Sequence, residues 1–144
     1  MYLLDTVVLS ELRKKFQRRN PHVVSWLASV APDDLFISTL SIAEVERGIE
    51  RQRKVNPSFA DELAEWLDVV LRSYYERILP LTTGIARRWG RFSAQIGHDG
   101  FDLAIAATAL EHGLTVATRN VSDFASTGAA LINPFEPPPR RRRS

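Results

Sequence analysis

The 144-residue sequence lacks cysteine, and this absence excludes disulfide bonds and thiolate metal sites. It also lacks an apolar run of the roughly 20 residues that a membrane-spanning helix needs. No basic segment precedes the apolar start of the chain, which argues against a signal peptide. No glycine-rich turn follows the first apolar run, so a dinucleotide-binding domain is excluded. Together these absences predict a soluble cytoplasmic protein without a membrane partner.

Positive charge is concentrated near the end of the sequence. The formal net charge is +2, and four positive charges belong to Arg140–Arg143, so the rest of the chain carries a net charge of −2. Apolar residues make up 44% of the chain, which is enough for one core. We therefore expect one folded domain over residues 1–136 and a disordered Pro/Arg-rich tail over residues 137–144. A contact between this tail and nucleic acid is the alternative.

Segments with strand and helix spacing alternate along the chain. Short apolar runs predict five strands, at residues 1–5, 35–38, 78–81, 114–118 and 130–132. Helical periodicity predicts six helices, at residues 6–16, 21–30, 41–52, 56–75, 82–96 and 102–112. Gly113 is expected to end the last of these. The alternation predicts an α/β fold with a mostly parallel sheet of about five strands.

Polar residues fall at the predicted junctions between strands and helices. They are Asp5, Glu44, Asp102 and the segment Thr118-Arg119-Asn120. Open parallel sheets place their functional crevice at the carboxyl ends of the strands. Carboxylates gathered there repel one another unless a cation joins them, and oxygen ligands favour Mg²⁺ or Mn²⁺. Such an ion can activate water against a phosphodiester, so the pattern points to metal-dependent hydrolysis.

Each acid also has a purely structural alternative. Ser41-x-x-Glu44 matches a capping box, and Asp99-x-x-Asp102 matches an N-cap acid followed by a first-turn acid. Asp5 could likewise cap the helix that follows it. Asp99 is also a rival of Asp102 for the site itself. The sequence alone leaves these alternatives open.

Ordered segments of the chain resemble the toxin branch of the PIN-domain family, the VapC- and FitB-like ribonucleases. They are YLLDTVVLSELR (2–13), SIAEVERGI (41–49), DLAIAATA (102–109), GLTVATRN (113–120) and LINPF (131–135). The resemblance implies a three-layer α/β/α fold and Mg²⁺-dependent cleavage of RNA. It also implies growth inhibition until a small antitoxin protein binds, and a homodimer that can assemble further with the antitoxin.

The resemblance also implies roles for particular residues. Asp5, Glu44 and Asp102 match the catalytic, metal-binding acids, and Asn120 falls where a fourth acid often lies. Thr6 and Thr118 are expected to support them. A group of arginines on one predicted helix is a candidate for RNA contacts, with an ordinary charged surface as the alternative: Arg87, Arg88 and Arg91. The tryptophans are interpreted as core or interface residues because they share helical spacing with apolar residues: Trp26, Trp66 and Trp89.

Two positions depart from the family pattern. Val7 stands where the family usually has asparagine, and Asn120 offers a carbonyl oxygen without a negative charge. These departures favour an alternative function, a degenerate, non-catalytic PIN-like domain that binds RNA or an antitoxin. Metal-dependent RNA cleavage separates the two hypotheses.

Two further classes of acid-bearing α/β protein are disfavoured. A receiver-type phosphoacceptor needs a lysine late in the chain, whereas the lysines here are all early: Lys14, Lys15 and Lys54. A haloacid-dehalogenase-type phosphatase needs Asp-x-Asp after the first strand, and Asp5-Thr6-Val7 lacks the second acid.

Overall fold

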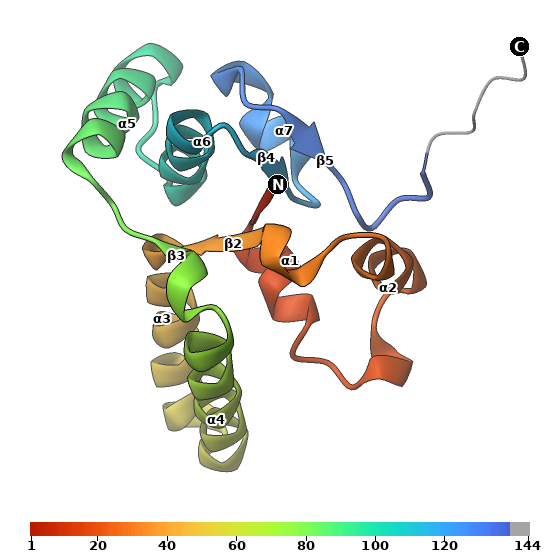
Figure 1. Cartoon of the computed structure of the whole chain (residues 1–144). Helices are drawn as coiled ribbons and strands as arrows, with labels where there is room; N and C mark the ends of the chain where they lie inside the picture. The colour runs from red at the N-terminus through yellow and green to blue at the C-terminus, as the bar shows by residue number, and fades with distance from the viewer. Residues whose placement is uncertain (139–144) are drawn as a thin grey trace, which may run out of the picture.

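The short apolar runs of the sequence pair into one five-stranded sheet (Figure 1). In the computed structural model, which describes residues 1–138, the strands are all parallel and follow the order β3-β2-β1-β4-β5. Their bounds are β1 (Tyr2–Leu4), β2 (Leu35–Ser38), β3 (Ile78–Leu79), β4 (Thr115–Ala117) and β5 (Leu131–Ile132). All five predicted strands are present. The third ends before Pro80, whose missing N–H cannot extend a ladder.

Within residues 1–138, seven α-helices connect and flank the strands. They are α1 (Thr6–Glu11), α2 (Pro21–Ala28), α3 (Thr39–Val55), α4 (Pro57–Ser73), α5 (Thr83–Ile96), α6 (Phe101–His112) and α7 (Val121–Phe124). Within the described residues, side chains cap five of their N-termini, as expected for these residue types: Asp5, Asn20, Ser38, Asn56 and Thr82. Gly113 ends α6 with a φ of 66°, which confirms its predicted role.

The first helix is shorter than predicted. It ends at Glu11, and Phe16, expected on its apolar face, lies in a 3₁₀ turn with 65% of its surface exposed. The cause lies in two residues that follow the helix in the sequence. Arg19 donates hydrogen bonds to the carbonyls of Leu12 and Lys14, and Glu11 accepts one from the backbone N–H of Asn20. These bonds turn the chain away from the helix and toward α2.

Alternate residues of the central strands face two different cores. Leu4 packs with Val8 and Leu9 of α1, whereas Leu3 packs with Ile105 of α6. Helices α1 to α4 lie on one side of the sheet and α5 to α7 on the other (Figure 1). The predicted three-layer α/β/α architecture is therefore confirmed.

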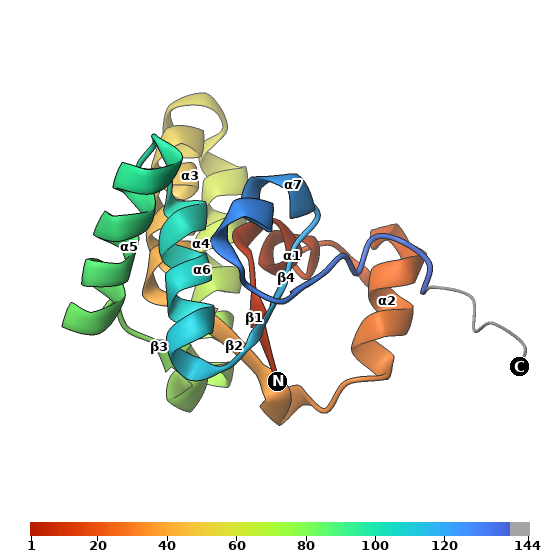
Figure 2. The same ribbon diagram turned by 90° about the horizontal axis from the view of Figure 1, so that it is seen from above.

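Two helix pairs extend the layers. Helices α3 and α4 pack as a hairpin with their own small apolar cluster, which contains Ile49, Ala60 and Leu67. Helices α5 and α6 lie side by side on the other face of the sheet (Figure 2). None of the helices within residues 1–138 combines the length and the apolar character that crossing a membrane requires.

The predicted tail is described only in part. Pro137 and Pro138 are exposed, while Arg140–Arg143, for which disorder or a nucleic-acid contact was expected, lie outside the described residues.

Candidate active site

The carboxyl ends of the central strands open into an acidic cavity of about 810 Å³. Five carboxylates line it: Asp5, Glu44, Asp99, Asp102 and Asp123. The parallel sheet explains the gathering, because the chain leaves β1, β2 and β4 at the same edge. Asn120 and Val7 also line this cavity. The residues that the sequence predicted for a site at this edge are thus brought together.

Asp5 is the most enclosed of these acids, with 9% of its surface exposed. It follows β1 directly and caps α1, where its Oδ1 accepts a hydrogen bond of 2.8 Å from the backbone N–H of Thr6. Its Oδ2 accepts one of 2.8 Å from the Thr118 hydroxyl. The capping interpretation of Asp5 is therefore confirmed, and it coexists with a place in the cavity.

Burial raises the pKa of Asp5 above its ordinary value. The hydrogen bonds from Thr118 and Thr6 act in the opposite direction, and the negative charges of Glu44 and Asp102 raise the pKa further. Burial therefore disfavours the charged form of Asp5, although Thr6 and Thr118 donate hydrogen bonds to this carboxylate. A nearby positive charge would relieve this.

Replacing Asp5 with asparagine should therefore stabilise the unliganded protein at neutral pH. The pKa of Asp5 is higher in the folded chain than in the unfolded chain. The free energy of unfolding therefore falls as the pH rises from the unfolded-state pKa through the folded-state pKa of this carboxyl. Below the unfolded pKa the two proteins should converge. Thermal melts in EDTA from pH 3.5 to 8 should show a melting temperature for Asp5→Asn that exceeds the parent only at the higher pH, by about 2–4 °C for each kcal/mol relieved. A lower melting temperature than the parent at pH 8 would contradict this account.

Glu44 is held by the hydroxyl of Thr6, which Ser41 contacts in turn. Thr6 Oγ1 lies 2.9 Å from Glu44 Oε1 and 3.0 Å from Ser41 Oγ. A carboxylate only accepts, so Thr6 donates its single proton to Glu44 and accepts from Ser41. Ser38, and not Ser41, caps α3 through the Leu40 N–H. The capping-box interpretation of Ser41-x-x-Glu44 is therefore wrong, because α3 begins three residues earlier than that pattern requires.

Asp102 occupies the first turn of α6. The N-cap of that helix is Gly100, so the prediction of Asp99 as an N-cap acid is wrong. A Cβ atom at Gly100 would lie 2.6 Å from Asp102 Oδ1, which explains why glycine fits there. Asp99 lines the rim of the same cavity and is exposed, whereas Asp102 is half-buried. The cavity therefore contains both rivals.

Asn120 lies in the loop after β4 and is linked to Asp5 by two successive hydrogen bonds. Its backbone N–H donates to Thr118 Oγ1 at 3.0 Å, and that hydroxyl donates to Asp5. Thr118 is fully buried, so it fixes the loop after β4 against the end of β1. One turn later, Asp123 lines the cavity from α7. Sequence reasoning missed Asp123, although the Asn120-x-x-Asp123 spacing is itself typical of a helix start.

Arg47 of α3 is the one basic residue among the described residues that line the cavity. Its guanidinium lies 5.8 Å from the ring centroid of Phe101, a cation–π distance. Phe101 in turn packs edge-on against Trp89, with ring centroids 6.0 Å apart. The Trp89 Nε1 is buried and has no hydrogen-bond partner within residues 1–138. Sequence reasoning did not single out Arg47.

The arginines of α5 lie apart from the acidic cavity. Arg88 donates a hydrogen bond of 2.9 Å to Glu111 on α6, and Arg87 and Arg91 are exposed. None of the three is among the residues that line the acidic cavity in the described part of the chain.

The donors of the cavity fit a hard divalent cation by type and charge. They are carboxylate and amide oxygens, with five negative charges against the single charge of Arg47. Within residues 1–138, no three acidic or histidine side chains are already arranged to hold a metal ion. The carboxylate oxygens of Asp5 and Glu44 accept protein hydrogen bonds, yet each keeps a second lone pair.

Comparison with known proteins identifies the family. The model of the PIN domain matches residues 2–129. Over 141 residues the chain is 33% identical to Toxin FitB of Neisseria gonorrhoeae, covering 94% of this chain and 99% of that protein. It is 34% identical over 144 residues to VapC ribonuclease Y4jK of Sinorhizobium fredii, covering 95% and 99%. The crystal structure of FitAcB from Neisseria gonorrhoeae matches with a TM-score of 0.81 at 33% identity, covering 94% of this chain and 99% of that one. The chain therefore belongs to the PIN-domain family.

Proposed function

We propose that this protein is a metal-dependent endoribonuclease and the toxin half of a toxin–antitoxin pair. The observation that carries the proposal is the cavity in which five carboxylates surround a single arginine at the carboxyl edge of the sheet. The names of two relatives, VapC ribonuclease Y4jK and Toxin FitB, support an RNA substrate and a toxin role. A solved structure that matches this chain with a TM-score of 0.69 at 25% identity is a toxin–antitoxin complex from Klebsiella pneumoniae, which also supports a toxin role.

In this proposal Asp5, Glu44 and Asp102 hold Mg²⁺ or Mn²⁺. Such an ion supplies positive charge against the phosphodiester and acidifies water. Thr118 and Thr6 keep Asp5 and Glu44 in place, and Glu44 either completes the ion's ligands or positions the attacking water.

Arg47 has the remaining role in the cavity. Its planar guanidinium is suited to bind the oxygens of the phosphate being cut. Phe101 holds that guanidinium at the cavity wall.

The antitoxin is proposed to block the same cavity. An acidic crevice attracts a lysine or arginine, and such a side chain would compete with the metal for Asp5 and Glu44. A homodimer stays a prediction, as do RNA contacts of Arg87, Arg88 and Arg91.

Cleavage of labelled single-stranded RNA by the purified protein tests the proposal. We expect fragments with Mg²⁺ or Mn²⁺, none with EDTA, and inhibition by the product of a small neighbouring reading frame. Expression of the chain alone should stop growth. If no RNA is cut at millimolar Mg²⁺ while RNA or the antitoxin still binds, the degenerate-domain alternative is correct. The apolar side chain of Val7 and the uncharged side chain of Asn120, both in the cavity lining, are the features that favour that alternative.

Removing the Thr6 hydroxyl should weaken catalysis without unfolding the protein. Thr6→Val keeps the shape of the side chain but leaves Glu44 without its 2.9 Å hydrogen bond. Groups that orient a metal ligand typically contribute about 10–100-fold to metal affinity or activity. Thr6→Ser, which restores the hydroxyl, should recover most of the rate. If Thr6→Val and Thr6→Ser behave alike, the hydroxyl has no positioning role.

The fourth acid of the site should be Asp123 rather than residue 120. Asp123→Asn removes a charge from the cavity and should raise the Mg²⁺ concentration needed for half-maximal cleavage by up to about tenfold. Asn120→Asp adds a charge and should lower this midpoint, whereas Asn120→Ala should change activity less than Asp5→Ala. Metal titrations of RNA cleavage measure all four variants. An unchanged midpoint for Asn120→Asp would place residue 120 outside the metal's surroundings.

A further inference from the structure

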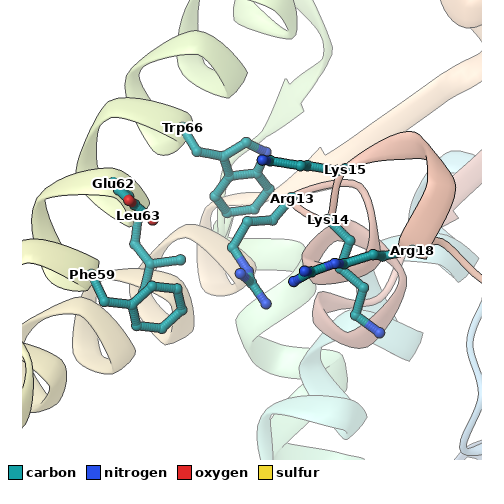
Figure 3. Close-up of a pocket in the computed structure, with 8 residues that line it drawn as sticks. All are labelled: Arg13, Lys14, Lys15, Arg18, Phe59, Glu62, Leu63 and Trp66. Atoms are coloured by element: carbon teal, nitrogen blue, oxygen red, sulfur yellow. The ribbon is translucent and has the colours of Figure 1, made fainter.

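A second cavity, of about 630 Å³, lies where α1 ends (Figure 3). One wall is the segment after α1, and the other is the first half of α4. We call it the basic–aromatic cleft, after the four cations and two large rings that line it: Arg13, Lys14, Lys15, Arg18, Phe59 and Trp66. Glu62 is the one acid in its lining among the described residues.

Most of the positive charge in this cleft is available to a ligand. All four cations are exposed, and within residues 1–138 only Lys14 forms an ion pair, at 2.9 Å with Glu11. Arg13 reaches across the cleft, where its guanidinium lies 5.2 Å from the centroid of the Phe59 ring (Figure 3). The Arg19 bonds that end α1 also hold this segment in its turned shape.

The cleft and the acidic cavity are lined by neighbouring turns of one segment, α1 and the residues that follow it. Ser10 lines the acidic cavity and Arg13 lines the cleft. The two are one helical turn apart, because the Arg13 N–H donates to the Ser10 carbonyl at 3.2 Å. From Asp5 to Arg13 the chain rises roughly 12 Å at helical spacing, which a few nucleotides can span.

An acidic cavity alone repels a polyanionic substrate. Five carboxylates disfavour an RNA backbone, so affinity for RNA has to come from cations outside that cavity. The rings of the cleft add a surface on which unpaired bases can stack, and such stacking is tolerant of sequence. An acidic peptide would use the cations of the cleft, but it would need neither the rings nor a place one helical turn from the acidic cavity.

We propose that the basic–aromatic cleft binds the single-stranded RNA next to the phosphodiester held in the acidic cavity. Lys15 and Arg18 contact phosphates, and Arg13 and Phe59 receive a base. The inference rests on the proposed function, and it names the residues that hold the substrate beside the cut.

RNA binding tests the role of the positive charges in the cleft. The measurement uses the full chain carrying Asp5→Asn, because this substitution removes cleavage. Fluorescence anisotropy with a labelled single-stranded RNA should show that Lys15→Gln with Arg18→Gln weakens binding by about tenfold. The slope of log affinity against log salt should become shallower by about 1.4, since each phosphate contact in a single strand contributes about 0.7. The matched control is Arg51→Gln with Arg72→Gln. These arginines are exposed on α3 and α4 and line neither cavity, and the net charge changes equally.

The substitution Phe59→Leu tests whether the Phe59 ring stacks with a base. We expect single-stranded RNA to bind about tenfold more weakly, within the range measured for base–aromatic stacking, and duplex RNA to be little affected because its bases are not free. Trp66 is a poor choice for substitution, because it also packs into the core.

The outcomes separate this inference from the proposed function. Parental RNA affinity of the Lys15/Arg18 variant in the Asp5→Asn chain, together with cleavage by the same variant when Asp5 is kept, would overturn the inference alone. Equal weakening by the control pair would overturn it in favour of diffuse attraction by net charge. If the Lys15/Arg18 substitutions weaken binding of a polyglutamate peptide but not binding of RNA, the inference is overturned in favour of a protein ligand. If the Asp5→Asn chain binds no RNA and the parent cuts none, both proposals fail.

Discussion

Replacing Asp5 with asparagine is expected to lower the rate of RNA cleavage by about 10³-fold or more while the fold stays intact. The substitution keeps the shape of the side chain and its hydrogen bond to the Thr6 N–H, but it removes the most enclosed charge of the cavity. A bound cation contributes several kcal/mol of charge stabilisation, and each 1.36 kcal/mol is a tenfold change in rate. Single-turnover cleavage at saturating protein measures the effect on the chemical step.

Two further measurements make this result specific. Isothermal titration with Mn²⁺ should show weaker binding to Asp5→Asn, which separates loss of metal from loss of substrate. Asp68→Asn on the exposed face of α4 is the matched control, with the same change of charge away from the cavity, and should keep parental activity. Full activity of Asp5→Asn at low Mg²⁺ would refute the proposed role of this residue.

Leu9→Ala should produce the largest loss of stability. Leu9 is fully buried on α1 and packs in the same core as Leu4 and Val8. Truncating a buried leucine leaves a void and typically lowers the free energy of unfolding by about 2–5 kcal/mol, which corresponds to a drop in melting temperature of roughly 10 °C. Thermal and urea unfolding followed by circular dichroism measure the change.

Leu81→Ala provides the matched comparison for this substitution. The same atoms are removed from a side chain that is 41% exposed, so the expected loss is well under 1 kcal/mol. Similar losses for the two variants would mean that α1 is held by something other than its apolar face.

The placement of the acids was predictable because it follows from chain topology. Asp5 and Asn120 come after strands that pair in parallel, so the sequence pattern was enough to bring them to one edge. The same pattern placed Glu44 and Asp102 at this edge, and the family resemblance matched them to catalytic acids. The resemblance also predicted that Thr6 and Thr118 support the acids. What the sequence could not predict was which acid each hydroxyl contacts, because these hydrogen bonds join residues 38 and 113 positions apart.

The errors have local physical causes. The end of α1 depends on Arg19 and Asn20, which lie beyond any helical periodicity. The four-residue helix α7 is too short to show periodicity at all, and Asp123 was missed with it. Ser41-x-x-Glu44 matches the capping-box pattern in the sequence. The boundary between β2 and α3 lies at Ser38, however, and it is Ser38 that caps the helix.

The half-buried indole of Trp89, with its buried N–H, gives this protein an intrinsic fluorescent reporter. Its ring contacts Phe101, which lines the acidic cavity beneath Arg47, so a ligand that moves Arg47 changes the surroundings of the indole. Because its N–H has no partner within residues 1–138, a water molecule or ligand atom that reached it would shift its emission to longer wavelength. Trp26 packs against Tyr2 on the opposite side of the sheet and can serve as an internal reference in a variant that lacks Trp89. Occupancy of the cavity can therefore be followed by the intrinsic fluorescence of the unlabelled chain.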